Sequence, residues 1–105
     1  MAKITNPSNA GVSALKLSSV SGRLDDLAVT EIAGTKRYIT LIEGTGATEP
    51  TTNTGFVFCF AVEANSSAHL KIPVVFKDGL WAMSTSTPAD VTTKAGSCVF
   101  LADIP

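Results

Sequence analysis

Several short runs of the chain alternate apolar with other residues, and a period of two is the pattern of a β-strand with one buried face. Asp78-Gly79 follows the clearest run, 68–77, and this dipeptide is typical of a two-residue hairpin turn because both positions must tolerate positive φ. We therefore predict a hairpin in which Phe76 lies opposite Trp81, so that Trp81 packs in the core. The inward positions of the first strand are Leu70, Ile72, Val74 and Phe76.

Further strand-like runs are separated by Gly, Asn, Asp and Ser turn signals. The segment 24–33 fits helical spacing as well, but its Val29-Thr30-Glu31-Ile32 run favours a strand from about residue 27. These runs predict an all-β fold: an antiparallel β-sandwich, a jelly-roll-like fold or a small barrel of about six or seven strands, with at most one short helical turn. The other predicted strands cover 15–20, 37–43, 55–64 and 97–104.

Three segments are predicted to lie outside the strands. Residues 1–13 are small and polar, so we expect a flexible N-terminal arm that precedes a single β domain over 14–105. Residues 44–55 (GTGATEPTTNTG) form a long loop, and loops of this length are often functional. The helical turn is expected after Thr87, an N-cap residue followed by Pro88 at the first helical position.

Three of the predicted strands, 37–43, 55–64 and 97–104, are apolar on both faces. An antiparallel sheet in a monomeric sandwich normally exposes one face to water, so we expect the second face to be covered. The cover could be the N-terminal arm, the 44–55 loop or another subunit. If it is another subunit, a docking patch would consist of Val57, Cys59, Ala61, Val99 and Leu101, with Ile4 of the arm as a further interface residue.

Composition narrows the choice of partner. The 105 residues are 45% hydrophobic and only 16% charged, and the net charge is −1, so one core is expected and no electrostatic capture of nucleic acid or of anionic lipid. No apolar run is long enough for a membrane span, and no secretory signal is evident, so we expect synthesis in a cytoplasm. Cys59 and Cys98 both lie in apolar runs and are expected to be reduced.

Residues that could carry chemistry are few. His69 is the single histidine, and the adjacent Asp25-Asp26 would point to opposite sides of a strand, so we expect no enzyme activity, no metal and no cofactor. The alternative with a ligand is a carbohydrate-binding or tail-fibre, receptor-binding β domain. Its site would consist of Tyr38, Thr45, Thr51 and Asn53.

The polar arm MAKITNPSNAGVSALK and the β segments GFVFCFAVEA and SCVFLADI together resemble the small decoration, or cement, proteins of tailed-bacteriophage capsids. The resemblance spans the whole chain. It implies a non-enzymatic virion structural protein, made in the host cytoplasm and located on the capsid surface. It also implies a homo-oligomer, trimer or dimer, that binds the major capsid protein or another virion component and stabilises the assembled lattice.

Overall fold

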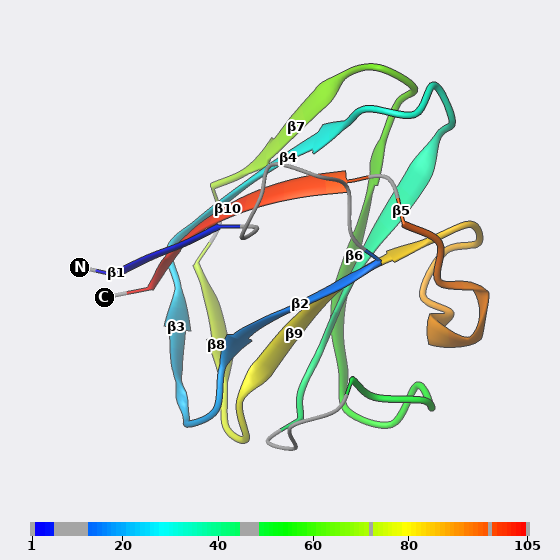
Figure 1. The fold of residues 1–105 in the computed structure, drawn as a ribbon. Helices are drawn as coiled ribbons and strands as arrows, with labels where there is room; N and C mark the ends of the chain where they lie inside the picture. Colours follow the sequence, from blue (N-terminus) through cyan, green and yellow to red (C-terminus); the bar gives the residue numbers. More distant parts are fainter. Residues whose placement is uncertain (1, 6–12, 45–48, 72, 97, 105) are drawn as a thin grey trace.

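The computed structural model describes residues 2–5, 13–44, 49–71, 73–96 and 98–104. These residues form two four-stranded sheets and one two-stranded sheet, and every pairing among them is antiparallel (Figure 1). The strands are β1 (Ala2–Thr5), β2 (Ala14–Ser18), β3 (Gly22–Leu24), β4 (Asp26–Glu31), β5 (Arg37–Ile42), β6 (Phe56–Val62), β7 (Ser67–Leu70), β8 (Val74–Phe76), β9 (Leu80–Thr85) and β10 (Cys98–Ile104).

The all-β prediction is confirmed. One sheet has the order β1-β10-β4-β7, the second has β2-β9-β5-β6, and β3 pairs with β8. The predicted strands at 37–43, 55–64 and 97–104 correspond to β5, β6 and β10, and the ambiguous segment 24–33 contains strand β4 rather than a helix. The described residues form ten short strands instead of the expected six or seven, because several of the predicted runs are broken or extended by short edge pieces.

The main core lies between the sheets. Alternate residues of β4 and β10 meet alternate residues of β5 and β9, as the period of two requires. The largest fully buried side chains of this core include Phe76, Phe100, Leu24, Leu27, Ile39, Leu41 and Leu80.

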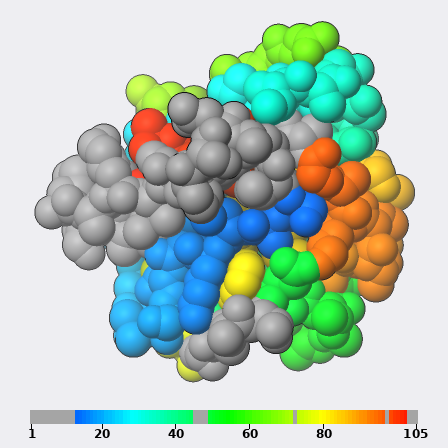
Figure 2. Space-filling model, in the orientation of Figure 1, coloured from blue at the N-terminus to red at the C-terminus, as the bar shows by residue number. Residues whose placement is uncertain are grey.

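A smaller second core lies on the outer face of the β2-β9-β5-β6 sheet. It consists of Ile42, Trp81, Met83 and Val91, and Val91 belongs to the 3-10 turn η1 (Val91–Thr93). The segment 86–96 therefore covers this part of the sheet. In the space-filling view, only a small yellow patch, the colour of β9, is visible between β2 (blue) and the green residues, and the orange segment lies beside it (Figure 2).

The predicted hairpin is wrong, although Trp81 is buried as predicted. β8 pairs with β3, while β9 lies between β2 and β5, so Phe76 and Trp81 belong to different cores. The cause is Gly79, whose φ of +82° turns the chain from one sheet to the other. A Cβ there would lie 2.5 Å from the carbonyl oxygen of Gly44, so glycine is required by close packing rather than by a hairpin turn.

The run 68–77 is two strands rather than one. β7 ends at Leu70 and β8 begins at Val74, with Pro73 between them. Proline cannot donate a ladder hydrogen bond, which favours a break where the chain changes sheet. Ile72, predicted to point inward, lies outside the described residues.

The N-terminus and the helical turn also differ from expectation. Residues 2–5 of the predicted arm form β1, which pairs with β10 and thereby satisfies its second edge, while 6–12 lie outside the described residues. The turn η1 is capped by Asp90 rather than Thr87. A helix cannot start at Pro88 because Ala89 has a positive φ of 54°.

Candidate interaction surface

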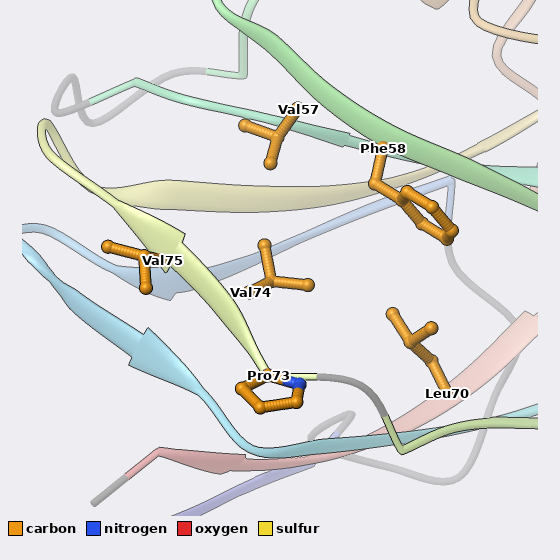
Figure 3. A pocket seen from close by; sticks show the side chains of 6 residues that line it. All are labelled: Val57, Phe58, Leu70, Pro73, Val74 and Val75. Carbon is orange, nitrogen blue, oxygen red and sulfur yellow. The ribbon is translucent and has the colours of Figure 1, made fainter.

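A shallow apolar hollow lies at the open side of the sandwich, where the edge strand β6 faces the segment that joins β7 to β8 (Figure 3). Its volume is about 180 Å³. Figure 3 shows the side chains converging on it from both sides. They are Val57, Phe58, Leu70, Pro73, Val74 and Val75.

A β-bulge in β6 shapes this hollow. Leu41 pairs with Phe58 but the next residue, Ile42, pairs with Phe56, so Val57 is the extra residue. Val57 packs against the main core, whereas an unbroken alternation would place it on the same outer face as Cys59. The bulge therefore turns a second apolar side chain of β6, beside Phe58, toward the hollow.

The rim of the hollow is exposed and apolar. Phe58 is 38% exposed and Val75 is 72% exposed, and Pro73 is exposed beside them. We call these three residues the apolar rim. Phe58 also contacts Phe60, with 6.4 Å between the ring centroids, so its ring is held in place by a neighbour.

The hollow is suited to an apolar side chain of a protein. Sites for drug-sized ligands measure about 300–1,000 Å³, so this one is too small for such a ligand. Among the described residues, no titratable side chain lines it. What it offers chemically is burial of apolar surface, which is the interaction that adjacent exposed hydrophobic residues commonly provide to a protein partner.

The residues predicted to form one interface patch are not brought together. Cys59, half-buried, and Ala61, exposed, lie on the outer face of the β2-β9-β5-β6 sheet, while Val99 and Leu101 lie on the outer face of the opposite sheet. Leu101 is 41% exposed and Val99 is half-buried. Ile4 pairs with Ala102 at the far edge of that second sheet.

The residues predicted for a carbohydrate site are also dispersed. Tyr38 lies near the start of β5, with Nζ of Lys36 5.4 Å from its ring centroid. Asn53 lies in the loop before β6, and its side-chain oxygen accepts a hydrogen bond from the Val91 amide (2.8 Å). Thr51 is exposed, and Thr45 lies outside the described residues.

The ionisable groups form pairs rather than a reactive cluster. Nε2 of His69 lies 2.5 Å from Oδ1 of Asp26 on the outside of the sandwich, and Asp25 instead pairs with Arg23. Asp25 raises the pKa of Arg23, first through its hydrogen bond and then through its charge. Within the described ranges, no three His, Cys, Asp or Glu side chains come together as metal ligands would. Cys59 and Cys98 are not joined by a disulfide.

Two features of this surface could not be read from the sequence. The bulge at Val57 depends on how β6 pairs with β5, and the nearness of Pro73 and Val75 to β6 depends on the break between β7 and β8. The signal that was visible is the two-sided apolar pattern of 55–64.

Comparison with known proteins leaves the family open, since the chain matches no family model, and no characterised protein or solved structure is significantly similar to it. Over the described part of the chain, the structure has no helix long and apolar enough to span a bilayer.

Proposed function

We propose that this chain is a non-enzymatic structural protein that binds protein subunits, and that it serves as a decoration protein on the assembled capsid of a bacteriophage. The observation that carries the proposal is the apolar rim around the hollow. Two large exposed side chains, Phe58 and Val75, flank the hollow together with Pro73, and no ionisable group is among the described residues that line it; this favours a protein contact over a catalytic one.

The mechanism is thermodynamic. A protein that binds the assembled shell better than its free subunits stabilises the shell by mass action. Many copies on one shell add their contributions, so each contact can be weak. The low charge of the chain makes such binding insensitive to salt, because little of the attraction is ionic.

Co-sedimentation tests this proposal. The purified chain is mixed with empty shells assembled from the major capsid protein of the same genome, before and after shell expansion. We expect saturable binding to the expanded shells only. Failure to sediment with either form of the shell contradicts the proposal.

A matched pair of variants assigns the binding to the apolar rim. Val75→Lys places a charge on the rim, and loss of one buried valine, about 1.5 kcal/mol, corresponds to a roughly tenfold weaker affinity. Val20→Lys makes the same change at another exposed valine, 65% exposed in the turn between β2 and β3, and is expected to bind like the parent chain. Equal binding by both variants would exclude the rim as the contact.

A further inference from the structure

The edge of β6 differs from the other sheet edges in the described part of the chain. β6 is seven residues long and pairs only with β5, so its second row of backbone N–H and C=O groups has no strand beside it. Proteins usually protect such edges with charges, proline or short strands. The strand sequence, FVFCFAV, contains no charged residue and no proline.

The other edge strands carry such protection. β1, β2 and β3 contain Lys3, Lys16 and Arg23 respectively, and β8 is only three residues long. β7 is four residues long and carries His69, which pairs with Asp26. The bulge at Val57 interrupts only the beginning of β6 and leaves Phe58–Val62 in regular pairing with β5.

We infer that β6 is a dimer contact, through which a second copy of this chain adds its own β6 as an antiparallel neighbour and extends the β2-β9-β5-β6 sheet across a two-fold axis. This contact uses the backbone edge of β6, whereas the shell contact of the proposed function uses the side chains of the apolar rim, so the inference goes beyond that function. A two-fold contact closes on itself, so two open edges are satisfied without further stacking.

The strand is compatible with itself in this arrangement. The register that pairs all seven residues is centred on Cys59, and it places Phe58 opposite Phe60 of the second copy. Glu63, the first charged residue after β6, then lies opposite Gly55, so no like charges meet.

The dimer is expected to be weak, because a single strand pair with a few side chains makes a small interface. Sedimentation velocity over a range of concentrations should therefore show the mass rising from one chain toward two. A constant mass of one chain, or growth beyond two chains, would overturn the inference.

Ala61→Lys supplies the missing edge charge. Ala61 is exposed on the outer face, so the variant should fold with an unchanged far-ultraviolet circular dichroism spectrum and remain a single chain at every concentration. Thr30→Lys is the matched control, since Thr30 is exposed on β4, an inner strand of the other sheet, and this variant should dimerise like the parent. A folded Ala61→Lys that still dimerises contradicts β6 pairing.

Cross-linking through Cys59 gives a second test of the dimer contact, and it can be done on the parent chain. Cys98 is fully buried and Cys59 is half-buried at the centre of β6, so a short bismaleimide should join two chains through Cys59 alone. The product should be absent in Cys59→Ser and in Ala61→Lys. Absence of the product from the parent chain at concentrations where its mass is that of two chains would place the dimer contact elsewhere.

The dimer and the capsid role can fail separately. A chain that stays single but sediments with expanded shells refutes the β6 dimer and leaves the proposed function standing. A β6 dimer that binds no shell does the reverse.

Discussion

Replacing Glu31 with glutamine tests a buried carboxylate that bonds two turns of the chain together. Glu31 is 1% exposed at the end of β4, and its carboxylate accepts four backbone hydrogen bonds. Oε1 accepts from the amides of Gly34 (2.9 Å), Thr35 (3.1 Å) and Asn65 (3.0 Å), and Oε2 accepts from Ala33 (2.9 Å). One carboxylate thus joins the β4–β5 turn to the β6–β7 turn.

The expected cost follows from these bonds. Glutamine retains one oxygen, so at best three bonds persist in weaker, uncharged form, and its amide group faces an N–H donor where Oε2 stood. Hydrogen bonds to charged groups contribute about 1.5–3 kcal/mol each, and water can reach the freed amides because both turns are exposed. We therefore expect Glu31→Gln to lower the free energy of unfolding by about 2–4 kcal/mol, a large part of a small domain's stability.

Urea unfolding followed by the fluorescence of Trp81, the only tryptophan, measures this change as a shift of the midpoint at constant slope. Glu63→Gln is the control, because Glu63 is a 68% exposed side chain whose one ion pair, with Lys36, is on the surface. Its expected cost is below about 0.5 kcal/mol. The reasoning is refuted if Glu31→Gln unfolds within about 0.5 kcal/mol of the parent chain.

Three further changes test other parts of the structure. Gly79→Ala should lower the free energy of unfolding in urea by at least about 2 kcal/mol, because the added Cβ would lie 2.5 and 2.8 Å from two backbone carbonyl oxygens and the φ of residue 79 is positive. An unchanged free energy of unfolding would contradict this packing. Trp81→Phe should lower the free energy of unfolding by less than about 1 kcal/mol, since it removes an indole N–H that is buried with no hydrogen-bond partner in the described residues. A decrease above about 3 kcal/mol would show that this N–H has a hydrogen-bond partner. Hydrogen bonds from the Thr92 side chain, and then from its backbone amide, lower the pKa of the Asp90 carboxyl from its ordinary value of 3.8. The ionised carboxylate therefore caps η1 fully above pH 3.8, and the cap is lost as the pH falls through the lower pKa of the folded state. The Thr92 amide shift in NMR should accordingly titrate with a midpoint below 3.8, and a midpoint above it would contradict the cap.

Alternation along the chain was sufficient to find the long strands and insufficient to pair them. β5, β6 and β10 were predicted because apolar residues recur along each of them without a break. Such a strand buries apolar side chains at any position in a sandwich, so its pattern does not depend on which strand it pairs with. The Asp78-Gly79 signal failed because it is local, whereas the position of Gly79 is decided by contact with Gly44 and Ser18, far away in sequence. Residues 2–5 gave no strand signal because β1 is defined by its partner β10 rather than by its own pattern.

For the candidate surface, too, the sequence indicated the strands but not how they are placed relative to one another. The sequence indicated that 55–64 is apolar on both faces, but it could not separate a covered face from an open edge. It grouped Val57 with Leu101, which the two sheets place far apart in the fold. The hollow was missed because it requires the bulge in β6 and the break before β8, and both follow from tertiary pairing.

Cover from within the chain explains most, though not all, of the two-sided apolar pattern. On β5 and β9 the outer side chains Ile42 and Met83 are fully buried under Val91, and they need no partner. The cover ends at β6, where Cys59 is half-buried and Ala61 is exposed. The large exposed apolar side chains of this sheet therefore belong to its edge strand β6, where Phe56 is 45% and Phe58 is 38% exposed. The proposed β6 pairing reaches this strand from the side, in the plane of the sheet, where its open backbone edge also lies.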